Sequence, residues 1–370
     1  MGGNLLEINN QTITGNLYTV IPDLLYNNLH FLLATVTGTH GSAPQVPGSA
    51  AIIGENGLIA GTVGGGSVEI ALLKRAPAAL NQKTSAWHHF NLGHDISSEE
   101  GSICGGGMRI LVDAMPDKHI GVYQQLASDI KLRIPGVLAT YARSGRDGKF
   151  HIDRTWITAS NKDSRPAQFP PETKETASAM LKRAIRGECL EISLQEASAT
   201  DGILFLELIL PRPRLLIAGA GHVGKALAHL GRLLDYEVIV WDDRSEYANP
   251  GNLPDANDIW SGSTDEAFVD FNADRDTSIV IVTRGHRTDT EVLKRLISSD
   301  AGYIGMIGSR KKILIMREQF LAEGWATPEQ WDRLHAPVGL EIGSKTVNEI
   351  ALSIAAQLVQ VRHSKTKQHG

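Results

Sequence analysis

The segment LLIAGAGHVG, Leu215–Gly224, decides the fold of the C-terminal half of the chain. Its apolar start, LLIA, predicts a buried strand, and the following HVGKALAHLGRLLD has helical spacing. Three glycines, Gly219, Gly221 and Gly224, stand between them in the pattern GxGxxG. A strand, a glycine turn and a helix in this order predict the first βαβ unit of a parallel sheet.

Strands and helices continue to alternate on the C-terminal side of this segment. Further apolar strands are expected in EVIVWDD, SIVIVTRG, YIGMIGS and RLHAPVG, and a closing helix in TVNEIALSIAAQLVQVR carries Ile350, Ile354 and Leu358 on one side. The break from the preceding pattern is PRPR, Pro211–Arg214. We therefore predict a Rossmann-like doubly wound parallel sheet over residues 211–370.

Residues 1–210 predict an N-terminal α+β domain instead, with its motifs between residues 30 and 115. We expect a hairpin from Ala50–Ile53 and Leu58–Thr62 with its turn at Asn56-Gly57, and then a helix with Ser67 as N-cap. Strands are expected in MRILVDAM, GVLATYARS, HIDRTWITA and GILFLELIL, and helices over 119–132 and 172–186.

Composition excludes several function classes. The chain has 370 residues, 42% of them hydrophobic, and a net charge of −5 without a basic block, so nucleic acid is not an expected partner. The apolar runs are too short to span a membrane, and the first fifteen residues lack the pattern of a signal peptide, so we expect a cytoplasmic protein. Two cysteines cannot ligate an iron–sulfur cluster, and CxxC and HExxH zinc motifs are missing. A redox cofactor would be organic, or a metal carried by an organic ligand.

The glycine turn after Leu215–Ala218 predicts a phosphate site. Gly219 makes the turn, Gly221 admits a pyrophosphate, and Gly224 lets helix and strand pack closely. The N-terminus of the helix, with His222, offers N–H groups to the phosphate. The alternative is a Rossmann domain that has lost its nucleotide and keeps the glycines for packing.

An acid ends the next strand, as Asp242 or Asp243. Asp242 favours a free ribose hydroxyl and hence NAD over NADP. Arg244, two residues further on, would tolerate a 2′-phosphate, so the preference is weak.

Two polar loops follow later strands. TRGHRTDTEVL contains Arg284, Arg287 and His286, a candidate general acid–base or phosphate ligand; the alternative is a polar loop in which Asp289 caps the next helix. GMIGSRKK offers Ser309 and Arg310 as an anion nest, or else a solvated helix face of Lys311 and Lys312.

The N-terminal domain holds a cysteine among glycines. GSICGGGMRI surrounds Cys104 with Gly105 and Gly106, and backbone N–H groups there should depress the pKa of the thiol. Nearby candidates for ligand contact are His40 and Gln45 in THGSAPQVPGS, and Gly64, Gly65, Gly66 and Glu69 in GTVGGGSVE. In the alternative interpretation these residues are structural: the glycines allow a crowded turn, and the cysteine is a small buried residue. We assign no role to Cys189, nor to His88, His89 and His94, which lack metal-ligand spacing.

These motifs, in this order, resemble those of the xanthine dehydrogenase accessory family, often called XdhC. The resemblance covers about residues 30–115 and 212–361, and residues 116–210 carry little of it. It implies a non-catalytic chaperone that binds the molybdenum cofactor (molybdopterin), protects it during sulfuration and inserts it into a molybdenum hydroxylase.

The resemblance also implies partners and ligands. The partners would be the apo hydroxylase, a cysteine desulfurase-type sulfurtransferase and a second copy in a homodimer. Cys104 would be the molybdenum ligand, the glycine loops would take the phosphate, and His40, Gln45 and Glu69 would contact the pterin or the oxo ligands. NAD or another nucleotide would occupy the Rossmann domain.

Two other functions remain open at this point. One is an NAD-dependent oxidoreductase acting on a small molecule, in which the N-terminal domain binds substrate and His286 transfers a proton. The other is a scaffold with a vestigial nucleotide site. The three hypotheses differ in the expected ligand: the chaperone would bind a pterin, the oxidoreductase would bind NADH, and the scaffold would bind neither.

Overall fold

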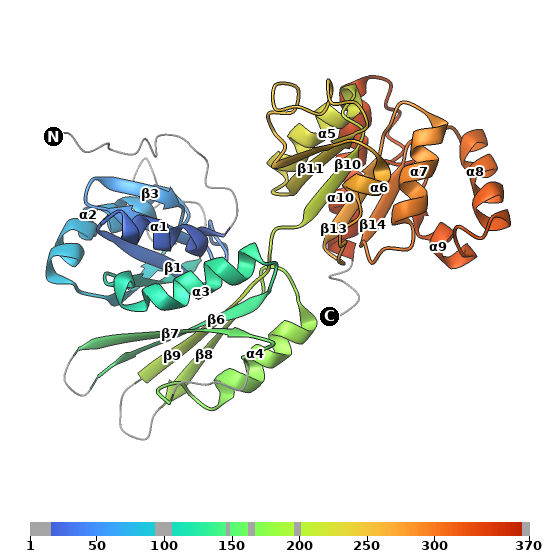
Figure 1. The fold of residues 1–370 in the computed structure, drawn as a ribbon. Helices are drawn as coiled ribbons and strands as arrows, with labels where there is room; N and C mark the ends of the chain where they lie inside the picture. The colour runs from blue at the N-terminus through green and yellow to red at the C-terminus, as the bar shows by residue number, and fades with distance from the viewer. Residues whose placement is uncertain (1–15, 93–105, 146–148, 162–166, 196–200, 365–370) are drawn as a thin grey trace. The chain divides into compact units, whose positions relative to one another are not determined.

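The computed structural model describes residues 16–92, 106–145, 149–161, 167–195 and 201–364. The chain forms two compact units, Met1–Pro211 and Arg212–Gly370, so the boundary lies within PRPR (Figure 1). Among the described residues no helix is long and apolar enough to cross a membrane.

Unit 1 contains two antiparallel sheets. Sheet A has the order β3-β2-β1-β5-β4, and sheet B has the order β7-β6-β9-β8. The strands of sheet A are β1 (Phe31–His40), β2 (Ala50–Gly54), β3 (Gly57–Gly61), β4 (Ala86–Asn91) and β5 (Gly107–Asp113). Those of sheet B are β6 (Gly136–Ser144), β7 (Phe150–Thr158), β8 (Cys189–Gln195) and β9 (Asp201–Ile209).

Apolar side chains on alternate strand positions build three core layers in unit 1. On β1, Ala34 packs toward α2 (Gly66–Gln82), whereas Leu33 packs with the cluster formed by sheet B and α3 (Ile120–Lys131). The outer face of sheet B is covered by α4 (Glu172–Arg183). The remaining helices of unit 1 are η1 (Leu17–Val20), α1 (Ile21–Tyr26) and η2 (Pro116–His119).

Unit 2 is a doubly wound sheet of six parallel strands in the order β12-β11-β10-β13-β14-β15. The two strands at its centre, β10 and β13, are each followed by a turn at the carboxyl edge, where open α/β sheets bind ligands. The strands are β10 (Arg214–Ala218), β11 (Glu237–Asp242), β12 (Asp258–Ser261), β13 (Thr277–Ile281), β14 (Tyr303–Met306) and β15 (Leu334–His335).

Helices cover both faces of the parallel sheet (Figure 1). One face packs against α5 (His222–Leu233) and α10 (Val347–Ser364), with Ile354 and Leu358 buried. The other packs against α6 (Thr264–Ala267), α7 (His286–Leu296), α8 (Arg310–Ala322) and α9 (Pro328–Asp332). The predicted fold class, α+β followed by a Rossmann-like sheet, is confirmed.

Three local predictions were wrong. The hairpin turn lies at Glu55-Asn56, because Gly57 pairs with Gly54 in the ladder. The N-cap of α2 is Gly65, whose φ of +64° suits glycine, so Ser67 already lies inside the helix. Asp289 does not cap α7, because the helix begins at His286.

Candidate functional site

In unit 2 the predicted glycine turn joins the carboxyl end of β10 to the start of α5. A Cβ atom on Gly219 would lie 2.5 Å from the carbonyl oxygen of Val282, and one on Gly224 would lie 1.8 Å from the carbonyl oxygen of Gly219. A Cβ atom on Gly221 would meet no atom within 4 Å. Backbone packing therefore requires the outer two glycines, whereas Gly221 faces open space at the start of α5, where His222 is exposed.

Asp242 is fully occupied by hydrogen bonds. Its Oδ1 accepts from the backbone N and Nε of Arg244 at 3.1 and 2.8 Å, and its Oδ2 accepts from Ala220 N and Arg244 Nη2 at 2.8 and 3.0 Å. Burial alone would raise the pKa of Asp242, but these bonds outweigh it and lower the pKa. A carboxylate has about four acceptor positions, so Asp242 would bind a ribose only after Arg244 moves away.

A second polar cluster joins the loops after β13 and β14. The carboxylate of Asp289 is fully buried, accepts a hydrogen bond from Thr283 Oγ1 at 2.6 Å, and forms an ion pair with Lys312. Ser309 caps α8 by accepting from Lys312 N at 3.2 Å. Thus Asp289 and Lys312 tie the two motifs to each other, a role that the sequence did not indicate.

The other polar side chains predicted near this edge of the sheet are exposed. His286 begins α7 in solvent, and Arg310 forms a pair with Glu341 in which both side chains are more than four-fifths exposed. Arg284 lies 3.9 Å from Asp243 and is 63% exposed. An exposed pair of this kind adds little stability, so these cations remain accessible to an anion.

In unit 1, Gly106 and Gly107 lie against the end of β1 and the loop that follows it. A Cβ atom on Gly106 would lie 2.3 Å from the carbonyl oxygen of Ser42, and one on Gly107 would lie 2.1 Å from the His40 ring. His40 and Gly107 are also partners in the β1–β5 ladder. These two glycines therefore permit close contacts between two motifs, at pairs of residues that are 64 and 67 positions apart in the sequence, as the crowded-turn alternative expected for Gly106.

The glycine turn before α2 forms a separate structure. Gly64 packs on Pro44, and its N–H donates to Thr62 Oγ1 at 3.1 Å; that hydroxyl donates to Glu69 Oε2 at 3.0 Å. Gly65 and Gly66 have positive φ and open space beside them. Gln45 accepts from Ser49 Oγ at 2.9 Å. Glu69 thus stabilises the turn, and neither it nor Gln45 lines the pocket described next.

A pocket of about 460 Å³ lies where β1, β4 and β5 of sheet A meet the edge strand β8 of sheet B. Its volume falls within the range of small-molecule sites. Among the predicted ligand residues that the structure describes, His40 alone lines this pocket. The lining comprises Thr37, Gly38, Thr39, His40, Pro47, His89, Phe90, Asn91, Met108, Arg109, Cys189 and Glu191.

Strand register places the polar groups of the pocket on one face of sheet A. Arg109 pairs with Gly38 on one side and His89 on the other, and Gly107 pairs with His40 and Asn91. Residues two apart on a strand share a face, so both rows belong to the same surface. Two of its six positions are glycine: the Glu191 carboxylate lies over Gly38, and the His40 ring lies over Gly107.

Cys189 lies at the wall of this pocket and adjoins buried polar groups. Its Sγ would lie 2.8 Å from a Cβ atom on Gly48. Burial raises the pKa of the Cys189 thiol, and the carboxylate of Glu207 adds to the effect, so the thiol is neutral at physiological pH. Burial likewise raises the pKa of Glu207 to about 7, since the hydrogen bond from Tyr18 at 2.8 Å offsets only part of it.

Cys104 and Gly105 lie outside the described residues. The chain leaves the described region after Leu92 and returns at Gly106, and Leu92 N donates to Gly106 O at 2.7 Å. Asn91, which precedes Leu92, and Met108, which lies two residues after Gly106, both line the pocket.

Sequence reasoning missed Arg109, His89, Cys189 and Glu191. Cys189 and Glu191 stand two apart in a strand pattern, which gives them a common face, but the sequence contains no signal that β8 adjoins β1.

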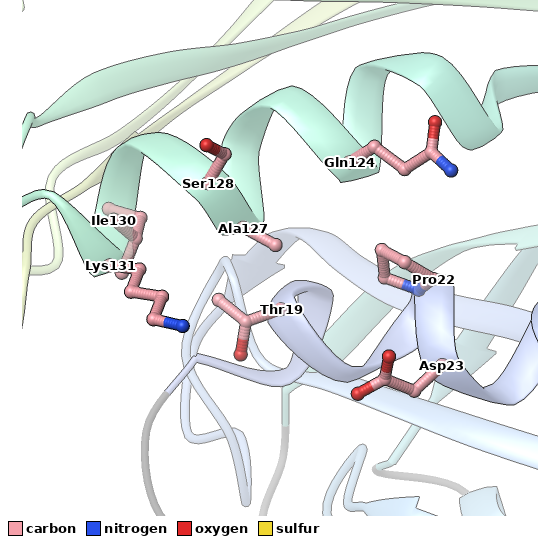
Figure 2. Close-up of a pocket in the computed structure, with 8 residues that line it drawn as sticks. All are labelled: Thr19, Pro22, Asp23, Gln124, Ala127, Ser128, Ile130 and Lys131. Atoms are coloured by element: carbon pink, nitrogen blue, oxygen red, sulfur yellow. The ribbon is translucent and has the colours of Figure 1, made fainter.

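A second hollow of about 480 Å³ lies between α1 and α3 and is lined by small and polar side chains, including Asp23, Ser128 and Lys131 (Figure 2). It carries no thiol or imidazole. Across the described part of the chain, no group of three or more His, Cys, Asp or Glu side chains is arranged to hold a metal ion. The pocket beside Arg109 is therefore the stronger candidate for an organic ligand.

Two parts of the chain match known protein families. The fold is an α+β domain followed by a Rossmann-like domain, and residues 215–358 match a family described as the XdhC Rossmann domain. Residues 24–91 match the XdhC and CoxI family. The chain belongs to the XdhC-like family.

Individual relatives are distant but extend along most of the chain. A probable xanthine dehydrogenase subunit of Bacillus subtilis is 25% identical, covering 94% of this chain and 98% of its own. The uncharacterized protein YqeB of Escherichia coli is 23% identical over 94% of this chain, which spans only 47% of that protein. A crystal structure described as a xanthine dehydrogenase from Bacillus halodurans has the same fold, with a TM-score of 0.71 and 21% identity, covering 94% of this chain and 96% of that one.

Proposed function

We propose that this chain is an accessory factor in the maturation of a xanthine dehydrogenase-type molybdenum hydroxylase. It binds the molybdenum cofactor as cargo, protects it while a sulfurtransferase modifies it, and delivers it to the apo hydroxylase. The observation that carries the proposal is the pocket of unit 1, whose rim includes residues on both sides of the Cys104 segment.

The polar groups of this pocket fit an anionic heterocycle that also carries N–H groups. Arg109 supplies a guanidinium donor, His40 and His89 supply imidazoles, and Glu191 supplies a carboxylate as acceptor. Cys189 is neutral and therefore a poor ligand for molybdenum, which leaves Cys104 as the thiolate that the proposal requires.

We propose in addition that a nucleotide binds at the carboxyl edge of the sheet of unit 2, with a phosphate beside Gly221. Open space at Gly221, the exposed guanidinium of Arg284 and the exposed imidazole of His286 support this part. NAD is one candidate, and the saturated Asp242 removes the reason for preferring it over NADP.

The test is anaerobic incubation of the purified protein with molybdenum cofactor, followed by desalting. Molybdenum is measured by mass spectrometry, and the pterin by the fluorescence of its oxidation product. We expect roughly one molybdenum per chain in the wild type, loss in Cys104→Ala, and retention in the control Glu188→Gln, whose side chain does not line the pocket.

Other results would redirect the assignment. Equal retention by Cys104→Ala would remove Cys104 as ligand. Failure of the wild type to retain molybdenum, together with tight titration by NADH and hydride transfer, would favour the oxidoreductase.

A further inference from the structure

The pocket of unit 1 contains a half-satisfied carboxylate. Glu191 Oε1 lies 3.0 Å from Arg109 Nη2, whereas Glu191 Oε2 is buried and has no hydrogen-bond partner among the described residues. The Glu191 side chain is 16% exposed. A buried oxygen without a donor is unfavourable, so a ligand that brings N–H groups would complete the site.

Side chains of the pocket lie over the two glycines of this surface. A Cβ atom on Gly38 would come within 3.3 Å of Glu191 Oε2, and the ring of His40 lies over Gly107. The Glu191 carboxylate and the His40 ring therefore border the pocket on the same face of sheet A, and a planar heterocycle in the pocket can contact both.

We propose that Glu191 recognises the 2-amino-4-oxopyrimidine edge of a pterin. The ring N–H and the exocyclic amino group donate to its carboxylate, while Arg109, held by Oε1, offers its remaining N–H groups to the carbonyl oxygen. The assignment rests on the proposed function, because the proposed cargo contains this edge. Guanine carries the same edge, so a guanine nucleotide shares the chemistry.

Ligand comparison with the wild-type protein is the first test. Fluorescence titration is carried out with pterin, with lumazine, which has an oxo group in place of the 2-amino group, and with GMP. A carboxylate repels the oxo group, so pterin should bind at least about tenfold more tightly than lumazine. Tighter binding of GMP than of pterin would support recognition of this edge by Glu191. It would also identify a guanine nucleotide as the ligand that carries the edge.

Matched variants form the second test. Glu191→Gln should weaken pterin binding about tenfold or more, because a carboxamide presents one acceptor instead of two. Glu188→Gln is the control: Glu188 also pairs with an arginine, Arg183, and also buries an unpartnered Oε2, but it does not line the pocket. Its pterin affinity should equal that of the wild type, and thermal unfolding of both variants verifies folding.

Equal affinities for pterin and lumazine in the wild type would overturn the assignment, as would unchanged binding by a folded Glu191→Gln. Both results are separable from the proposed function, which molybdenum retention decides. A protein that retains molybdenum but does not distinguish the two pteridines keeps its function and loses this recognition site.

Discussion

The two units differ in how their candidate sites relate to their cores. In unit 2 the open position Gly221 is separate from the packed positions Gly219 and Gly224, so ligand access and stability depend on different residues. In unit 1 the pocket residue Cys189 adjoins buried Glu207, and the charge of Arg154 acts on Glu207 in turn. A substitution at Gly221 should therefore change ligand binding without changing stability. A substitution behind the pocket of unit 1 should destabilise the fold as well.

The largest effect is expected behind the pocket of unit 1. Arg154 and Asp113 form an ion pair at 3.2 Å between the two sheets, with both side chains at most 2% exposed. Arg154→Met leaves the Asp113 carboxylate buried without its counter-charge, although Met115 N still donates to it, and should lower the free energy of unfolding by about 3–5 kcal/mol. Urea denaturation measures it. The control Arg143→Met breaks the half-exposed pair with Asp153 and should cost at most about 1 kcal/mol; equal losses would contradict the account.

A smaller loss is expected from Gly224→Ala in unit 2. The added Cβ atom would lie 1.8 Å from a carbonyl oxygen of the turn, which must shift together with its strand. We expect a loss of about 2–4 kcal/mol, measured by thermal or urea unfolding. A Gly224→Ala protein as stable as the wild type would show that the turn adapts to the added methyl group. Gly224 would then not be required for packing in unit 2.

Glu207→Gln should have a pH-dependent effect. The pKa of Glu207 in the folded protein, about 7, lies above its ordinary value, so the stability it contributes is present at acidic pH and lost as pH rises through 7. Glutamine does not ionise, so the variant should be more stable than the wild type by about 1–3 kcal/mol at pH 8.

Melting curves between pH 5 and pH 8 test this sign. The advantage of Glu207→Gln should shrink as the pH falls. An advantage of constant size across this range would show that Glu207 is not the titrating group.

The smallest effect on stability is expected for Gly221→Ala. No atom lies within 4 Å of the added Cβ atom and φ is −72°, so the free energy of unfolding should stay within about 0.5 kcal/mol of the wild type. Nucleotide affinity, measured by calorimetry with NADH, should fall because the methyl group occupies the space above the turn. Unchanged NADH affinity would remove Gly221 from the nucleotide site.

The sequence predicted the fold more completely than it predicted the site. Continuous apolar strands such as Leu215–Ala218 define a parallel sheet locally, and the glycine turn follows directly from them. The pocket of unit 1 depends on long-range register instead. Arg109 and Glu191 come from strands in different sheets, and the contact between β1 and β8 that unites them has no local signature.

Some motif residues also had a structural explanation that the sequence could not reveal. Gly107 is glycine because the His40 ring lies against it, and Glu69 holds Thr62 rather than lining the pocket. Asp242 was predicted from its strand position, but the sequence did not show that Arg244 would saturate it.

The molybdenum content of the wild type, Cys104→Ala and Gly221→Ala after identical anaerobic loading tests the central claim most directly. The account predicts about one molybdenum per chain for the wild type and Gly221→Ala, and loss for Cys104→Ala, because the cargo belongs to unit 1. Loss in Gly221→Ala with retention in Cys104→Ala would place the cargo in unit 2 and contradict the account.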